Sequence, residues 1–191
     1  MINSELGHVN TLKKFHSEIV RQQEEAHGED YCQIHDAITR YMKDCKSYME
    51  LGTHQGGTAS AALLTNPKRV YLVDKDMSRY NKFLKPIAEK YAQNKDIELI
   101  VNQTDSTGFA CINMTDMLVI DSYHHPAHMI KELTMHGSNV KKYILAHDTT
   151  AMMGKPDARL YDCLKTWADS NGFVECERGI TNVGYVVFKR I

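Results

Sequence analysis

Two short apolar runs in this chain each end in an acidic residue. Residues 117–120 (Met-Leu-Val-Ile) precede Asp121, and residues 143–146 (Tyr-Ile-Leu-Ala) precede His147 and Asp148. Such runs are typical of parallel strands that are covered on both faces. Because parallel strands end at one edge of a sheet, we expect the two carboxylates to lie close together. Paired carboxylates repel each other unless a proton or a cation lies between them, and a divalent ion with oxygen ligands is one solution.

Histidines follow the first of these acids closely. His124, His125 and His128 lie within five residues of one another. A histidine with a pKa near neutrality can accept the proton of a substrate hydroxyl, and His124 is the first candidate for that base. His124 and His128 are spaced i, i+4, so on a helix they could ligate a metal; near a helix start they could equally be surface residues. No H-E-x-x-H or G-x-S-x-G pattern occurs, which argues against a metalloprotease or a serine hydrolase.

Earlier in the chain, a glycine-rich turn follows the short run of residues 48–50, in the segment Glu50-Leu51-Gly52-Thr53-His54-Gln55-Gly56-Gly57-Thr58. The pattern predicts a strand, a tight turn and a helix start, where free N–H groups favour polar or anionic ligands. It is neither a dinucleotide turn nor a phosphate loop. It resembles the S-adenosylmethionine (SAM) turn of class I methyltransferases. An ordinary loop between strand and helix is the alternative. The resemblance implies that the following residues contact SAM: Glu50, Gly52, Thr53, Gly56, Gly57 and Thr58.

Acids also follow the next two predicted strands. Asp74 ends the run Val70–Val73, about where an acid holds ribose hydroxyls in a nucleotide-binding α/β fold; a solvated loop acid is the alternative. Asp105 and Ser106 follow the run Ile97–Val101. There the aspartate could accept from an adenine amino group and the serine could donate to a ring nitrogen. A turn acid beside a helix-capping serine would look the same.

The remaining pattern supplies the elements that would position these residues. Residues 10–45 are predicted to form two helices, and strands then alternate with helices near 58–65, 77–93, 126–136 and 157–170. Pro86 is expected to kink or split the second of these four helices. Residues 173–176 and 183–189 predict an antiparallel hairpin. Five strand–helix units closed by such a hairpin resemble the class I methyltransferase sheet. The resemblance implies an α/β, Rossmann-like fold with a helical cap (residues 1–46) and one α/β unit (47–191).

Composition restricts the class of protein. The 191 residues carry a formal net charge of −1 and no long basic run, so no nucleic-acid or anionic-membrane partner is implied. No apolar run is long enough to span a bilayer, and residues 1–5 lack the features of a secretion signal. The cysteines are odd in number and scattered, which favours reduced thiols in a cytoplasm. They are Cys32, Cys45, Cys111, Cys163 and Cys176.

Three blocks together resemble the cephalosporin hydroxylase and rhamnosyl O-methyltransferase family. They are E-x-G-T-x-x-G-G-T at residues 50–58, D-S-x-H-x-x-x-H-x-x-x-E-L at residues 121–133, and the apolar strand ending in Asp148-Thr149. The resemblance covers roughly residues 47–150 and implies a class I methyltransferase fold that binds SAM and magnesium. The implied metal ligands are Asp121, His147 and Asp148. The family has an acid at the middle position, and a histidine suits zinc, iron, nickel or copper better than magnesium.

The resemblance implies a SAM-dependent O-methyltransferase that acts on a small hydroxylated molecule such as a sugar or a secondary metabolite. Asp121 and His124 would be the catalytic residues, and Asp121 would also lie at the cofactor, with or without a divalent metal. Two alternatives keep the fold: a metal-dependent oxygenase or hydrolase, and a non-catalytic SAM-binding protein. A homo-oligomer is left open.

Overall fold

The protein is described by a computed structural model that covers residues 9–109, 114–152 and 155–191. Residues 1–5 and Cys111, which entered the sequence argument, lie outside these ranges. The main strands are β1 (Ser47–Leu51), β2 (Arg69–Asp74), β3 (Glu98–Gln103), β4 (Thr115–Ile120), β5 (Val140–His147), β8 (Phe173–Gly179) and β9 (Tyr185–Arg190). The other four cysteines are free thiols, and no helix in the described ranges is long and apolar enough to cross a membrane.

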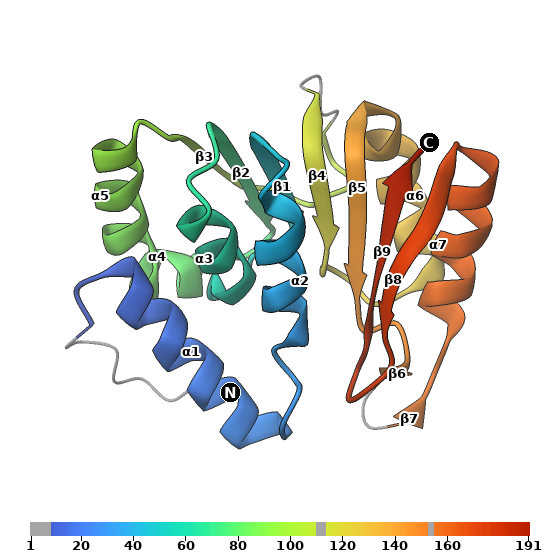
Figure 1. Ribbon diagram of the computed structural model, residues 1–191, viewed down its shortest axis with the longest axis horizontal. Helices are drawn as coiled ribbons and strands as arrows, with labels where there is room; N and C mark the ends of the chain where they lie inside the picture. The colour runs from blue at the N-terminus through green and yellow to red at the C-terminus, as the bar shows by residue number, and fades with distance from the viewer. Residues whose placement is uncertain (1–8, 110–113, 153–154) are drawn as a thin grey trace.

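These strands form one sheet in the order β3-β2-β1-β4-β5-β9-β8 (Figure 1). The strands β1 to β5 are parallel, and β9 lies antiparallel between β5 and β8. The five predicted parallel strands and the predicted hairpin are therefore confirmed. The order reverses between β1 and β4, and ligands of open α/β sheets bind in the crevice outside such a switch point.

Helices cover both faces of the sheet. They are α1 (Leu12–His27), α2 (Gln33–Met42), α3 (Gly57–Leu64), α4 (Ser78–Phe83), α5 (Lys85–Lys95), α6 (Pro126–His136) and α7 (Arg159–Ser170). Pro86 lies in the first turn of α5, so the predicted split of the second helix is confirmed. A short hairpin, β6 (Ala151–Met152) with β7 (Lys155–Pro156), and a 3-10 turn, η1 (Gly137–Asn139), were not predicted.

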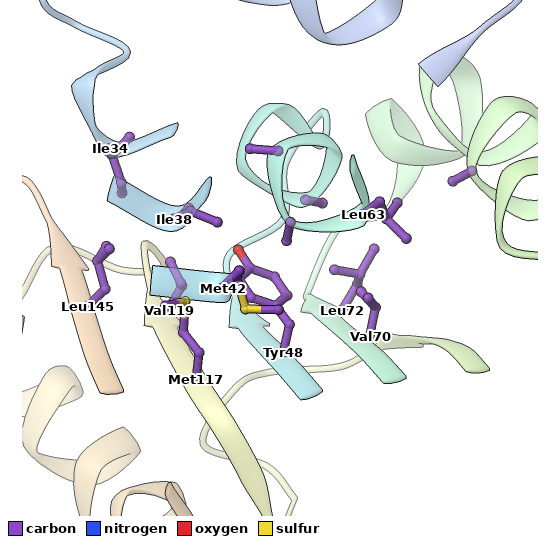
Figure 2. Close-up of a cluster of buried hydrophobic side chains, with 14 of the residues drawn as sticks. Ile34, Ile38, Met42, Tyr48, Leu63, Val70, Leu72, Met117, Val119 and Leu145 are labelled. Atoms are coloured by element: carbon purple, nitrogen blue, oxygen red, sulfur yellow. The ribbon is translucent and has the colours of Figure 1, made fainter. Parts of the chain in front are cut away.

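Alternating strand residues separate the core into two layers. Met117 and Val119 of β4 contact the layer under α1 to α5, whereas Leu118 and Ile120 contact the layer under α6 and α7. Figure 2 shows side chains of α2 and α3 meeting those of β1, β2, β4 and β5 in the first layer. A shift of one residue would move every such side chain to the other face. The two layers thus fix the register, and with it the positions of the residues that follow each strand.

Candidate functional site

A cavity of about 620 Å³ opens at the carboxyl ends of the parallel strands. Its walls come from the loops after β1 to β5, from α1 and α2 and from the start of α3. Eleven of the residues predicted from sequence line it: Gly52, Thr53, Gly57, Thr58, Asp74, Asp105, Ser106, Asp121, His124, His147 and Asp148. Segments separated by almost a hundred residues are therefore brought to one site, as the sheet topology requires.

The turn after β1 depends on Gly52. Its φ is +95°, and a Cβ atom added there would lie 2.0 Å from the carbonyl oxygen of Asp121. Its N–H donates to Val73 O at 2.9 Å, while the N–H of Asp121 donates to Leu51 O at 2.8 Å. The turn is thus held between β2 and β4, and only glycine fits both the conformation and the space.

The same turn leads into α3 without a side-chain cap. The N-cap residue is Gly56, whose backbone is in the left-handed conformation. Because glycine has no side chain, no side-chain oxygen caps the first N–H groups of the helix. A Cβ on Gly56 would lie 2.3 Å from Leu84 Cδ2, so this glycine allows close packing. The cavity wall is formed by the first residues of the helix, Gly57 and Thr58. An uncapped helix start presents N–H groups and a partial positive charge to a ligand.

Glu50 has a different place from the one predicted. Its side chain is fully buried beneath the turn and accepts a hydrogen bond from the Tyr48 hydroxyl; it is not among the residues that line the cavity. Burial raises the pKa of Glu50 to about 8, although the bond from Tyr48 opposes this shift. Tyr48 and Glu50 are two residues apart in β1, so their side chains lie on the same face of that strand. This explains why Glu50 packs against Tyr48.

Asp74 is fixed at the cavity by two backbone donors. Its Oδ2 accepts from His54 N at 2.7 Å, and its Oδ1 accepts from Asp76 N at 3.0 Å. Each carboxylate oxygen can accept a further hydrogen bond. The carboxylate is therefore held in one orientation and can still receive the hydroxyls of a ligand.

The loop after β3 places Asp105 and Ser106 at the cavity. Oδ1 of Asp105 accepts from the backbone N and the hydroxyl of Thr107, and these bonds lower the pKa of the aspartate. The hydroxyl of Ser106 lies 3.0 Å from His128 Nε2, which also lies 3.3 Å from Oε1 of the buried Glu132. His128 therefore contacts the loop after β3. It does not belong to the group of potential metal ligands described below.

The central cluster joins the loops after β4 and β5. Nε2 of His124 lies 2.9 Å from Asp148 Oδ2 and 3.4 Å from Asp121 Oδ1. Nδ1 of His147 lies 3.4 Å from each of the same two oxygens. Potential ligand atoms of Asp121, His124 and Asp148 all lie within 4.8 Å of one another. The two predicted carboxylates do converge, and His124 joins them together with the predicted His147.

The charges in this cluster compensate one another. Burial opposes protonation of His124 and His147, but the two aspartates outweigh it and raise the pKa of each imidazole to about 10. The imidazoles in turn hold the pKa of Asp121 and Asp148 below the usual range, against the effect of burial. In the metal-free protein, two imidazolium ions therefore balance two carboxylates at neutral pH.

Other residues of the wall were not predicted. Gln23 of α1 and Ile34 and His35 of α2 line the cavity, as does Tyr31 just before α2. The ring of Tyr31 meets that of His147 edge-on, with centroids 5.8 Å apart. Gln23, Ile34 and His35 lie on amphipathic helices, whose pattern predicts packing against the core. The sequence therefore does not indicate that these residues contact a ligand. The way in which both helices cross the sheet edge decides their role.

Several solved structures share this fold. A Staphylococcus aureus protein assigned as a caffeoyl-CoA O-methyltransferase aligns with a TM-score of 0.65 at 13% identity, over 91% of each chain. N-methyltransferase NodS from Bradyrhizobium japonicum, in complex with S-adenosyl-L-homocysteine, aligns with a TM-score of 0.60 at 13% identity, over 95% of this chain and 98% of that one. Magnesium protoporphyrin IX methyltransferase ChlM from Synechocystis, with bound SAM, aligns with a TM-score of 0.60 at 12% identity, over 100% of both.

The predicted fold is therefore confirmed: the chain has the Rossmann-like fold of class I methyltransferases. No family model matches the sequence, and no curated protein matches it. The narrower resemblance to the cephalosporin hydroxylase family stays a prediction.

Proposed function

We propose that this protein is a SAM-dependent methyltransferase that transfers a methyl group to a hydroxyl of a small molecule. One observation carries the proposal: a single cavity at the switch point collects the turn after β1, Asp74 and the cluster of aspartates and histidines. Ligands of open α/β sheets bind at this edge. NodS and ChlM, which share the fold, were solved with S-adenosyl-L-homocysteine and with SAM, respectively.

The strand order suggests how SAM would lie. The adenine would face Asp105 and Ser106 after β3, and the ribose hydroxyls would meet Asp74 after β2. The sulfonium would then lie between the ends of β1 and β4, close to Asp121. The residues fit this ligand, because Gly52 leaves no side chain in the turn and α3 begins without a cap.

The reaction requires orientation and removal of one proton. The acceptor oxygen attacks the methyl carbon, a carbon–oxygen bond forms, and the carbon–sulfur bond breaks with its electron pair going to sulfur. The hydroxyl proton goes to His124, which accepts it only as the neutral imidazole; in the metal-free protein this form prevails above its pKa of about 10. Positioning of the two reactants supplies much of the acceleration, and a general base typically contributes a further factor of about 10²–10⁴.

The cluster also has a donor set that fits a divalent metal. Two carboxylates and the imidazole nitrogens of His147 or His124 suit zinc or iron better than magnesium. A bound ion would lower the pKa of a coordinated hydroxyl. With Asp121, His147 and Asp148 as ligands, His124 stays free to accept the proton.

The cavity lining favours a neutral or cationic acceptor. Lys75 is the one lysine or arginine among the described lining residues, and it follows Asp74 on the adenosine side. Beside Asp121 and Asp148 an acceptor with several phosphates would find no lysine or arginine among the described lining residues, and the two imidazoles of the cluster are already paired with these carboxylates. A small hydroxylated molecule agrees with this distribution better than a nucleic acid does.

The convergence of two aspartates with His124 also supports a second candidate, a metal-dependent oxygenase or hydrolase on the same fold. Calorimetric titration with SAM, combined with metal analysis of protein purified without added metal, separates the two. We expect saturable SAM binding to the wild-type protein and SAM-dependent methylation of a hydroxylated acceptor. Bound iron without SAM affinity would favour the oxygenase, and SAM binding without turnover of any acceptor would indicate a non-catalytic SAM-binding protein.

A further inference from the structure

One corner of the cavity lies between α2 and the start of α3. Gly57, the first residue of α3, allows two polar side chains to come close. From the position that a Cβ atom of Gly57 would occupy, His35 Cε1 lies at 3.1 Å, Gln23 Oε1 at 3.3 Å and His35 Nε2 at 3.5 Å. All three residues line the cavity. This corner thus combines an uncapped helix start with an imidazole and an amide.

The imidazole of His35 is almost completely buried, with 4% of its surface exposed, and its Nδ1 has no hydrogen-bond partner among the described residues. Burial lowers the pKa of His35 to about 3, so the ring is neutral and carries one proton. Nε2 is the ring nitrogen that lies beside the first turn of α3, 3.5 Å from the Cβ position of Gly57. With the proton on Nε2, the ring can donate a hydrogen bond to a ligand held at this helix start.

We infer that Gln23 and His35 bind the amino-acid end of the cofactor. The carboxylate would accept from the free N–H groups at the start of α3 and from His35 Nε2, because a helix start favours an anion. The ammonium group would donate to Gln23 Oε1. This assignment rests on the proposed function, since SAM is the ligand that carries an amino-acid group next to a sulfonium.

The positions of the other ligand groups support the same assignment. Asp74 and Asp105 follow β2 and β3, which leaves the adenosine on that side of β1. The acceptor must lie next to the cluster after β4 and β5, where Tyr31 contacts His147. The sulfonium carries an adenosyl group, a methyl group and an amino-acid chain. With the first two placed, the corner between α2 and α3 is left for the amino-acid chain.

Two adenosyl ligands test the inference by calorimetry. S-adenosyl-L-homocysteine carries the amino-acid group, whereas 5′-methylthioadenosine has a methyl group in its place. We expect the wild-type protein to bind the former more tightly. His35→Phe retains a ring without a donor, and Gln23→Ala removes the amide from a helix. Each variant should lower the affinity for S-adenosyl-L-homocysteine about tenfold and change that for 5′-methylthioadenosine by less than about twofold.

Gln22→Ala is the matched control, because Gln22 is the neighbouring glutamine on α1, donates its amide to Glu18 Oε1 at 2.7 Å and is not among the residues that line the cavity. It should leave the ratio of the two affinities unchanged. Equal losses for both ligands, or no loss in either variant, would overturn the inference while leaving the proposed function intact. If His35→Phe fails to fold, Gln23→Ala decides. If the wild-type protein binds neither ligand, the proposed function itself fails, and this inference fails with it.

Discussion

The Nε2 atom of His124 lies 2.9 Å from Oδ2 of Asp148, and this contact joins the loop after β4 to the loop after β5. Asp148 has a φ of +55°, a left-handed conformation that aspartate and asparagine adopt more readily than most residues. The backbone at Asp148 thereby turns a carboxylate toward a histidine that lies 24 residues earlier in the chain. In the proposed function, these two residues face the acceptor substrate.

His124→Gln should abolish most of the turnover and spare the cofactor. Glutamine retains hydrogen-bonding groups but cannot accept the hydroxyl proton, so we expect kcat to fall by about 10²–10⁴. The affinity for S-adenosyl-L-homocysteine should change little, because the proton acceptor faces the acceptor substrate. Steady-state kinetics and calorimetry measure the two quantities. His125→Asn is the control, since His125 is exposed and asparagine can also cap α6; equal losses in both variants would contradict the assigned role.

Asp148→Asn should remove metal binding and keep SAM binding. Asparagine tolerates the left-handed backbone of Asp148, but a neutral amide is a weaker ligand than a carboxylate. Titration of the metal-free protein with Zn²⁺ and with Mg²⁺ should give tighter binding for zinc in the wild type, because nitrogen donors favour it. Zinc binding of equal strength in the variant would place the metal elsewhere. Asp157→Asn, at an exposed ion pair with Arg159, is the control.

Asp74→Ala should weaken cofactor binding. If the carboxylate accepts from the ribose hydroxyls, its loss should reduce the binding free energy of SAM by about 1–3 kcal/mol. The neighbouring Asp76 accepts from Ser78 N and is not among the residues that line the cavity, so Asp76→Ala provides the comparison. Calorimetry of both folded variants measures the difference. An affinity for SAM that is unchanged in Asp74→Ala would remove the ribose from this position.

Gly52→Ala should destabilise the fold strongly. The added Cβ would lie 2.0 Å from Asp121 O, and the φ of +95° already disfavours an L side chain. Gly172 also has a positive φ, +73°, but a Cβ there would have no atom within 4 Å. We expect Gly172→Ala to cost about 1–2 kcal/mol from conformation alone, and Gly52→Ala to cost about 3 kcal/mol or more. Chemical denaturation measures both, and equal costs would show that space at Gly52 does not matter.

Glu50→Gln should change how stability depends on pH. The folded-state pKa of about 8 lies above the ordinary value of 4.5. The folded protein thus retains this proton while the unfolded chain loses it, so this group makes stability fall as pH rises from about 4.5 to about 8. The slope contributed is at most about 1.4 kcal/mol per pH unit. Glutamine cannot lose a proton and can still accept from Tyr48.

Urea denaturation at several pH values measures this effect. The free energy of unfolding of Glu50→Gln, relative to that of the wild type, should rise between about pH 5 and about pH 8. This range lies between the ordinary pKa of 4.5 and the folded-state pKa of about 8. Glu89→Gln, a change of an exposed residue on α5, should give a curve parallel to that of the wild type. A constant difference between Glu50→Gln and the wild type would mean that Glu50 does not titrate anomalously.

Local sequence patterns predicted the elements and the acids that follow the strands. The apolar runs before Asp74, Asp121 and Asp148 became parallel strands, because each is too apolar to leave either face exposed to water. The parallel arrangement then brought these acids to one edge. Pro86 ended α4 and began α5 for a local reason, since proline disrupts a helix interior but fits its first turn.

Tertiary structure decided which side chains share the cavity. Glu50 was predicted to touch the cofactor, yet it lies beneath the turn with Tyr48, because the face of β1 that carries both is covered by α2 and α3. His35 and Gln23 belong to helices whose pattern predicts only packing, and they reach the cavity because α1 and α2 cross the sheet edge beside α3. Sequence determines periodicity over neighbouring residues, whereas the distance between Gln23 and Gly57 depends on how separate helices meet.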